Sequence, residues 1–317
     1  MITVADYAAF LDAEYLRGYV DAGGAAVKFV VCPDDAAAQR FSAVLRERGE
    51  AAGFALARVD AVATRVHMIE QVFFEVSGQI DWDGLAAVAA RRALEAASYP
   101  VSPGGDLSLE GVAAGYGVDG RELKRDVDRQ LQRLVQRDYA MVADFRTAML
   151  RLCQAQLRTG QVADAEHAAI LDWLRGELRQ ISALKTALIF RRIARHNARS
   201  VLFSLAHWLA TNGRAGLILE LDLRRLAVAR RPDPDQRVGH YYSKAAVLDA
   251  YETLRQLVDS TDELSHCCVV AVVAPEFLSD AARGLDAYQA LKLRIYDEVR
   301  DRDRDNPYSS LIRLGAA

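Results

Sequence analysis

The sequence predicts an α/β fold, in which a mostly parallel sheet is interrupted along the chain by a large all-helical insertion. Apolar strand-like runs alternate with amphipathic helices before residue 100 and again after residue 210, an alternation typical of parallel sheets. Residues 107–180 lack any strand signal. We therefore expect the first part of an α/β core in residues 1–100, a helical insertion in residues 101–185, and the second part of the core in residues 186–317.

Each element is expected from its own pattern of apolar residues and turn signals. Apolar residues at helical spacing predict helices over residues 6–22, 36–48, 66–79 and 82–97. Apolar runs predict strands over residues 27–31, 53–60, 217–222, 267–273 and 311–314. A loop with Pro and Gly, residues 100–106, precedes the insertion. A long helix over residues 185–210 leads back to the core and ends at the stop signal Asn212-Gly213.

Composition and charge indicate a soluble globular protein. The chain of 317 residues is 51% hydrophobic with a formal net charge of −3, so it can bury a large core and is not basic overall. No apolar run approaches the roughly 20 residues that span a bilayer. The N-terminus lacks the basic start and apolar core of a signal peptide. We expect a cytoplasmic location and no membrane partner.

Residues 28–41 have the layout of a phosphate-binding P-loop, with an apolar strand, a turn and the start of a helix. A working loop needs glycines whose neighbouring backbone N–H groups converge on phosphate, then a Lys, then a Ser or Thr for magnesium. Here Ala38 stands at the Lys position and Gln39 at the hydroxyl position, and the loop contains no glycine. Asp34 and Asp35 would repel phosphate. The sequence therefore predicts a nucleotide site without its phosphate-binding groups.

A second degenerate motif lies in residues 216–223, an apolar strand that ends in an acid. Asp222 is suited to the role of the acid that holds a metal ion in nucleotide hydrolases. The next position in such enzymes usually carries a Glu that polarises water. Leu223 stands there and cannot accept a proton. The pattern predicts that the chain does not hydrolyse nucleotides.

The four cysteines do not form a disulfide framework or a metal site in our interpretation. Cys32 and Cys153 are isolated, whereas Cys267 and Cys268 follow His266 and invite a metal interpretation. Adjacent residues of a strand point to opposite faces of the sheet, so these three side chains cannot easily share one ion. We expect buried thiols and no metal.

The predicted insertion contains a candidate nucleic-acid contact. Residues 107–123 predict a short apolar helix, a Gly-containing turn and the start of a second helix, a spacing compatible with a helix-turn-helix. The second helix carries Lys124, Arg125 and Arg129, interleaved with Glu122, Asp126 and Asp128. The mixed sign favours an ordinary helical subdomain with a solvated charged face. Weak DNA binding and a partner-protein surface are the alternatives.

A second basic cluster lies on the predicted helix over residues 185–210. It consists of Arg191, Arg192, Arg195 and Arg199, with Arg195 and Arg199 four residues apart and therefore on one helical face. A surface helix paired with carboxylates is the favoured interpretation. A contact to a partner subunit or to a nucleic-acid backbone is the alternative.

Several further segments carry a resemblance to a known family. They are YLRGYVDAGG at residues 15–24, YETLRQLVD at 251–259, the strand and following turn at 267–278, RGL at 283–285 and NPYSSLIRL at 306–314. In this order and spacing the chain resembles the ATP-binding proteins of BREX-type bacterial phage-defence systems. The resemblance spans nearly the whole chain and implies an AAA+-like P-loop fold, with other defence-system proteins, a helicase or an ATPase among them, as partners. The chain departs from the family at the residues that define ATPase activity. The family's binding of ATP is therefore not expected of this chain, and we expect no cofactor.

These observations lead to one functional hypothesis and two alternatives. The strands and their patterning remain while the phosphate- and water-handling residues are replaced, which favours a non-hydrolysing pseudo-ATPase that acts as a scaffold or regulatory subunit. The first alternative is a nucleotide- or DNA-binding module with a non-standard site, in which Arg40 partly replaces the missing charge. The second is an active ATPase that residues of a partner chain complete.

Overall fold

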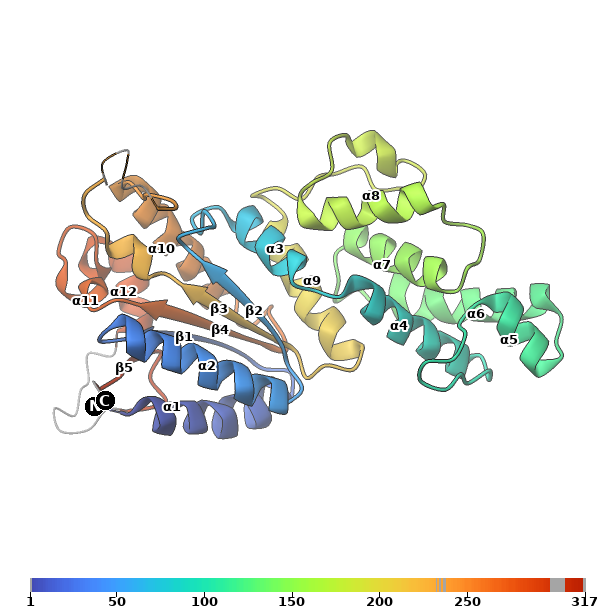
Figure 1. The fold of residues 1–317 in the computed structure, drawn as a ribbon, viewed down its shortest axis with the longest axis horizontal. Helices are drawn as coiled ribbons and strands as arrows, with labels where there is room; N and C mark the ends of the chain where they lie inside the picture. Colours follow the sequence, from blue (N-terminus) through green and yellow to red (C-terminus); the bar gives the residue numbers. More distant parts are fainter. Residues whose placement is uncertain (1, 232, 234, 236–237, 297–305, 316–317) are drawn as a thin grey trace. The chain divides into compact units, whose positions relative to one another are not determined.

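The computed structural model describes residues 2–231, 233, 235, 238–296 and 306–315 (Figure 1). The chain divides into two compact units. The first combines Met1–Val76 with Arg214–Ala317, and the second is Ser77–Gly213. The predicted insertion, residues 101–185, lies wholly within the second unit. The division of the chain at residues 101 and 185 stays a prediction.

The first unit is built on a sheet of five parallel strands in the order β2-β3-β4-β1-β5. The strands are β1 (Ala25–Val31), β2 (Ala55–Asp60), β3 (Leu217–Asp222), β4 (Cys267–Val273) and β5 (Leu311–Arg313). The predicted α/β fold with a mostly parallel sheet is confirmed. Every residue of β1, β3 and β4 is buried, which explains why these strands are continuous apolar runs rather than alternating ones.

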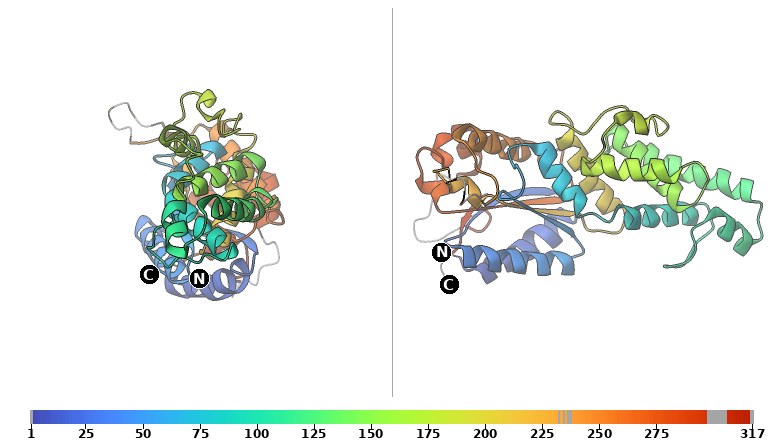
Figure 2. Two further views of the ribbon diagram at one scale, coloured as in Figure 1. Left: turned by 90° about the vertical axis from the view of Figure 1, so that its right-hand side faces the viewer. Right: turned by 45° about the horizontal axis from the view of Figure 1, so that its top comes forward.

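Helices cover both faces of the sheet (Figures 1 and 2). One face packs on α1 (Val4–Phe10), its π-helical continuation η1 (Leu11–Val20) and α2 (Asp35–Ala51), around a core that includes Tyr7, Leu11, Val30, Phe41 and Ile218. The other face packs on α3 (Ile69–Gly78), α10 (Lys244–Asp259), α11 (Glu276–Ser279) and α12 (Gln289–Ile295), where the Phe29 and Phe277 rings stack. Short 3-10 turns follow two of the strands, η4 (Arg224–Ala227) after β3 and η6 (Leu285–Ala287) after β4.

Gly216 sets the start of β3 because no other residue fits there. Its φ is +147°, and a Cβ on this residue would lie 2.1 Å from the carbonyl oxygen of His266. That carbonyl accepts a hydrogen bond of 2.8 Å from the backbone N–H of Leu217. The close approach therefore brings β3 into register with β4, and this register carries through to Asp222.

The second unit is helical throughout, and none of its residues lies in a strand. Its elements are α4 (Trp82–Ala96), α5 (Leu109–Tyr116), α6 (Gly120–Leu131), η2 (Gln132–Gln136), α7 (Ala143–Gln156), α8 (Asp164–Arg175), η3 (Ile181–Leu184) and α9 (Ala198–Thr211). The absence of a strand signal in residues 107–180 thus predicted the secondary structure of this segment correctly.

The prediction of one helix over residues 185–210 is wrong, because α9 begins only at Ala198. Between η3 and α9 the chain has turns and a segment without regular secondary structure. The Asn197 side chain accepts from the Ala194 N–H at 2.7 Å and donates to the Arg192 carbonyl at 3.0 Å. Such local side-chain bonds compete with helical ones, so a regular helix starts only beyond Asn197.

A lysine is buried in the middle of β1. Lys28 is 3% exposed, and its Nζ donates to the Tyr15 hydroxyl at 2.7 Å and to the carbonyls of Tyr308 and Ser309 at 2.8 and 3.1 Å. Burial lowers the pKa of its ammonium group to about 8. Because Tyr308 and Ser309 directly precede β5, this side chain ties the edge strand to the centre of the sheet.

The difference in unfolding free energy between the wild type and Lys28→Met should increase with pH between about 8 and 10.5. In this window the unfolded chain still binds the lysine proton that the folded chain has lost, so stability rises with pH. The rise is at most about 1.4 kcal/mol per pH unit. Urea titrations at several pH values measure it.

Lys28→Met is needed as the reference because the buried cysteine thiols change the pH dependence of stability in the opposite direction. Burial raises the pKa of all four cysteines, so their contribution to stability falls above their ordinary value of 9.0. Both proteins contain them, so the effects of Cys32, Cys153 and Cys267 cancel in the difference, whereas that of Cys268 cancels only in part because the charge of Lys28 lowers its pKa. A difference in unfolding free energy that does not change with pH would contradict the lowered pKa of Lys28.

Candidate functional site

The turn at the predicted P-loop contains only three residues between β1 and α2, namely Cys32, Pro33 and Asp34. The Asp34 side chain caps the helix by accepting a hydrogen bond of 2.7 Å from the backbone N–H of Ala37. The first N–H groups of a helix are the groups that bind phosphate in P-loop proteins. Here a carboxylate of the chain itself takes that place.

The other two P-loop positions are also unlike those of a working loop. Ala38, at the Lys position, belongs to the core between α2 and the sheet, and Gln39, at the hydroxyl position, is exposed. Neither has a side-chain contact with the acids of β3 among the described residues.

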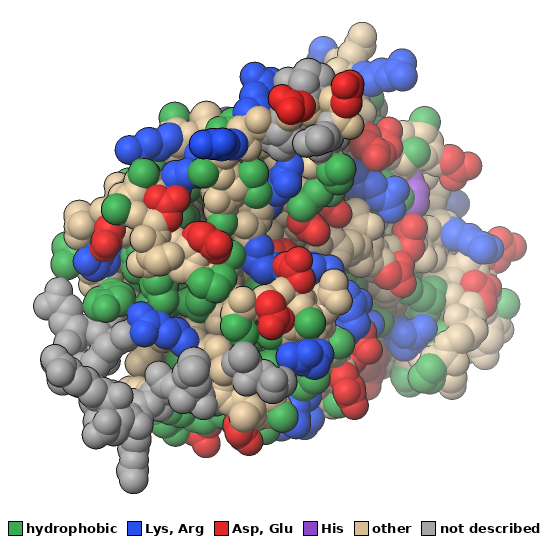
Figure 3. Space-filling model, turned by 60° about the vertical axis from the view of Figure 1, so that its left-hand side comes forward, with side chains coloured by type: hydrophobic (Ala, Val, Ile, Leu, Met, Phe, Trp, Pro, Cys, Tyr) green, Lys and Arg blue, Asp and Glu red, His purple; other side chains and the backbone are tan. Residues whose placement is uncertain are grey.

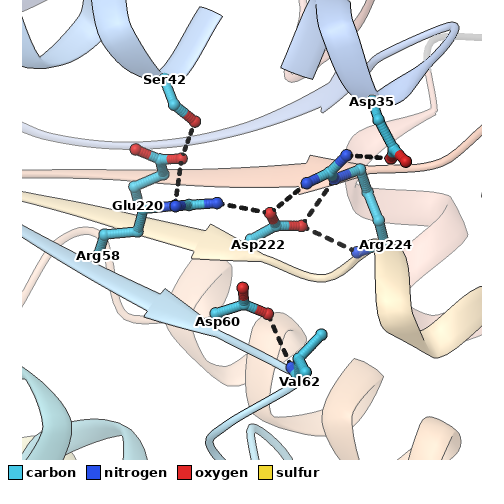
Figure 4. A network of polar contacts seen from close by, with 8 residues as sticks. All are labelled: Asp35, Ser42, Arg58, Asp60, Val62, Glu220, Asp222 and Arg224. Atoms are coloured by element: carbon cyan, nitrogen blue, oxygen red, sulfur yellow. Dashed lines mark hydrogen bonds and ion pairs between the residues drawn. The ribbon is translucent and has the colours of Figure 1, made fainter. Parts of the chain in front are cut away.

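Asp222 ends β3 between two arginines, as Figure 4 shows. It is 4% exposed. Its Oδ2 accepts from Arg58 Nη2 at 2.8 Å and from Arg224 Nη2 at 2.6 Å, and its Oδ1 accepts from Arg224 Nε at 2.9 Å. Burial alone would raise the pKa of Asp222, but the hydrogen bonds and charges of these guanidinium groups outweigh it and hold the pKa below its ordinary value. Asp222 is therefore an ionised acid whose counterions are protein side chains.

Arg224 joins the two degenerate motifs. Besides Asp222, its guanidinium pairs with Asp35 in the first turn of α2. In P-loop hydrolases the acid at the end of this strand holds Mg²⁺, which in turn bridges the phosphates at the helix N-terminus. In this chain a guanidinium makes the corresponding bridge between the strand end and the helix start.

Glu220 extends the network along β3 towards α2. It is 1% exposed, accepts a hydrogen bond from the Ser42 hydroxyl and pairs with Arg58 Nε at 3.2 Å. Burial raises the pKa of Glu220, and the contacts with Ser42 and Arg58 oppose that rise. Arg58 thus lies against both acids of β3 and joins β2 to them.

Sequence reasoning did not single out Arg58, Glu220 or Arg224. One signal was available, because Glu220 and Asp222 are two apart in a strand and must point to the same face. Arg58 is directly opposite Glu220 in the β2–β3 register, but that pairing depends on the strand order.

Leu223 and the four cysteines are buried, and Cys32 lies near the charges of Arg224 and Asp222. Leu223 is buried, and its backbone N–H donates to the Val272 carbonyl at 2.8 Å. All four cysteines are free and buried, as expected. Across the described residues, no group of three or more His, Cys, Asp and Glu side chains is placed to hold a metal ion.

The two helices of the predicted helix-turn-helix are present as α5 and α6, separated by Gly117 in a left-handed conformation. The basic residues of α6 have local partners. Arg125 lies 3.9 Å from both Glu122 and Asp126, Arg129 lies 3.5 Å from Asp126, and Lys124 Nζ donates to the Thr159 carbonyl at 3.4 Å. The face therefore has mixed sign, and DNA binding by it stays a hypothesis.

The arginines of the second basic cluster occupy different environments. Arg191 pairs with Asp144 at 2.9 Å, and Arg192 donates to the Arg179 carbonyl. Arg195 is exposed and has no hydrogen bond or ion pair with a described residue, whereas Arg199 alone lies on α9. They do not form the single helical face that the sequence predicted.

The surface of the first unit near α11 and α12 carries both acidic and basic side chains (Figure 3). Figure 3 brings this side forward, and in its coloured part acidic and basic side chains are interspersed. Among the described residues no helix is both long and apolar enough to cross a membrane.

Together, the parallel sheet, the strand–turn–helix at β1 and the acid at the end of β3 define an α/β protein of the P-loop-like class. The family model of the BREX system ATP-binding protein BrxC/D matches residues 18–316, and the chain belongs to this family. The resemblance seen in the sequence is thereby confirmed. Searches of curated proteins and of solved structures found no match.

Asp222→Asn should lower the unfolding free energy at neutral pH by about 3 kcal/mol, since it leaves two guanidinium groups at a buried position without their carboxylate. The loss should fade as pH falls below the ordinary pKa of 3.8, because the lowered pKa means that the carboxylate stabilises the fold only while ionised. Urea unfolding measures both effects.

Asp60→Asn is the matched control for this change. Asp60 lies opposite Asp222 in the β2–β3 register, and its side chain accepts one hydrogen bond, from the Val62 N–H at 2.7 Å. Equal losses in the two variants would mean that the arginine pairs contribute nothing beyond an ordinary hydrogen bond.

Proposed function

We propose that this chain is a non-hydrolysing member of the BrxC/D family that acts as a scaffold or regulatory subunit of a BREX phage-defence complex. The observation that carries the proposal is the Arg224 bridge between Asp222 and Asp35. It occupies the place where a nucleotide hydrolase keeps its metal ion and phosphates. Membership of a BREX family implies that other proteins of the system are its partners.

Two physical arguments support the loss of hydrolysis. Phosphate at the start of α2 would meet the Asp34 and Asp35 carboxylates instead of a Lys and converging N–H groups. Magnesium at Asp222 would have to displace two guanidinium groups that are already bound to it. In active enzymes, electrostatic groups of this kind each lower the barrier by several kcal/mol.

Purified protein with magnesium should release phosphate from ATP no faster than its Asp222→Asn variant, because neither protein positions the γ-phosphate or the attacking water. ATP in large excess should also leave the melting temperature unchanged, since a ligand that binds only the folded state would raise it. A phosphate-release assay and a thermal melt measure these two results.

Asp60→Asn serves again as the control, and each variant is assayed well below its own melting temperature. Turnover that Asp222→Asn abolishes and Asp60→Asn retains would contradict the proposal. A melting temperature that rises with ATP would favour the alternative of a nucleotide-binding module. Activity that appears only with other BREX proteins and disappears with Asp222→Asn would favour a site that a partner completes.

DNA binding by α6 should be weak, and reversing Lys124, Arg125 and Arg129 to Glu should abolish any gel shift. Acids on the same helix lie beside Arg125 and Arg129, which leaves few unopposed cations, and each phosphate contact adds to the salt dependence. Reversal of three exposed arginines elsewhere, Arg46, Arg230 and Arg231, is the control. A tight shift that survives the α6 reversal would eliminate the helix-turn-helix hypothesis.

A further inference from the structure

One stretch of the chain contains cations and no carboxylates. Residues 179–219 include no Asp or Glu, although the whole chain has 43 of them. The same stretch contains seven Lys and Arg residues: Arg179, Lys185, Arg191, Arg192, Arg195, Arg199 and Arg214. In a protein with a net charge of −3, such a local excess of positive charge is the electrostatic footprint of an anionic partner.

Part of this stretch, residues 185–197, connects η3 to α9 and is here called the basic strap. It is anchored to the second unit and is not a loose loop. Trp173 Nε1 donates to the Arg191 carbonyl at 2.9 Å, and Arg191 pairs with Asp144 of α7. Ala187, Ile189 and Ile193 are buried. These contacts fix the course of the strap over the helices.

Between the buried residues the strap exposes two large apolar side chains. Leu188 is 68% exposed and Phe190 is 62% exposed, on either side of the buried Ile189. Leu188 also has φ of +60°, a conformation that is rare for a branched residue without special support. Strained backbone that surrounding contacts maintain occurs preferentially at binding sites.

The backbone of the strap offers unpaired donors. Counting only partners within the described part of the chain, the N–H groups of residues 190–193 make no hydrogen bond. Residues 190–192 are exposed, and unpaired backbone N–H groups of this kind can pair with an extended chain. Lys185 and Arg195 at the ends of the strap are exposed, and their side chains likewise have no partner among the described residues.

We propose that the basic strap is a docking site for an extended segment of a partner protein in which acidic and apolar residues alternate. The acids would face Lys185 and Arg195, and the apolar residues would cover Leu188 and Phe190. Aromatic and arginine side chains together are typical of the centres of protein interfaces. Nucleic acid fits less well, because a base could stack on Phe190 but would leave the exposed Leu188 uncovered, and Arg191 already pairs with Asp144.

The basic strap gives the proposed function a surface and a partner chemistry. It rests on that function only because a partner must exist. It does not depend on whether the nucleotide site is active. A failure at the strap would leave the ATP experiments unaffected, and the reverse also holds.

The test uses the full-length protein and a short fluorescent peptide of alternating Glu and Leu, with binding followed by anisotropy. The peptide should bind in a salt-sensitive manner, whereas a peptide of alternating Gln and Leu should bind at least about tenfold more weakly. Two double variants of the protein, Lys185→Glu with Arg195→Glu and Leu188→Ser with Phe190→Ser, should each weaken binding of the Glu/Leu peptide by about tenfold or more.

Two matched changes outside the strap control for charge and exposure. Arg121→Glu reverses an exposed cation of α6, and Leu293→Ser removes an apolar side chain that is 72% exposed. Both should leave peptide binding unchanged, and unchanged melting temperatures should show that every variant is folded. Absence of peptide binding, or binding that both strap variants retain, would overturn the proposal. A single-stranded oligothymidylate that binds through the strap while the peptide does not would overturn it in favour of nucleic acid.

Discussion

The buried carboxylate of Asp222 is the centre on which the carboxyl edge of the sheet depends. It accepts hydrogen bonds from Arg58 of β2 and from Arg224 of the turn that follows β3, and Arg224 reaches on to Asp35 of α2. Three segments that are far apart in the sequence are thereby held by one negative charge. Without it, the Arg58 guanidinium would keep only Glu220 as a counterion, and the Arg224 guanidinium only the exposed Asp35.

The same network balances the charges at this edge of the sheet within the protein. In a working site, part of the charge balance comes from the ligand, because phosphates satisfy the helix N-terminus and magnesium neutralises the strand acid. In this chain Asp34 supplies the anion and Arg58 and Arg224 supply the cations. The charged groups at the end of β3 are thus paired within the protein, whereas Oε2 of the neighbouring Glu220 is buried without a hydrogen-bond partner among the described residues.

The degenerate nucleotide site and the basic strap differ in whether their charged groups have partners within the protein. At the degenerate nucleotide site the charges are paired and mostly buried. Along the basic strap, backbone N–H groups and the cations of Lys185 and Arg195 have no protein partner within the described residues, and Leu188 and Phe190 face solvent. The charges of the first site are paired within the protein, whereas those at the ends of the strap are free to contact a partner.

Local pattern was enough to predict the strands and the paired helices α5 and α6, because each of these depends on residues within a few positions of one another. Family membership could likewise be inferred from short segments in order. The partners of Asp222 could not, because Arg58 and Arg224 reach it only through the strand order that places β2 beside β3. The burial of Lys28 also depends on the arrival of residues 308 and 309 from the far end of the chain. The expected helix over residues 185–210 was wrong for a related reason. Apolar spacing there is compatible with a helix, but the contacts of Trp173 and Asn197 hold the chain in an irregular conformation before α9. The sequence by itself thus determined most of the helices and strands and the family, whereas the tertiary structure decided which charges meet, since that depends on neighbours that only folding brings together.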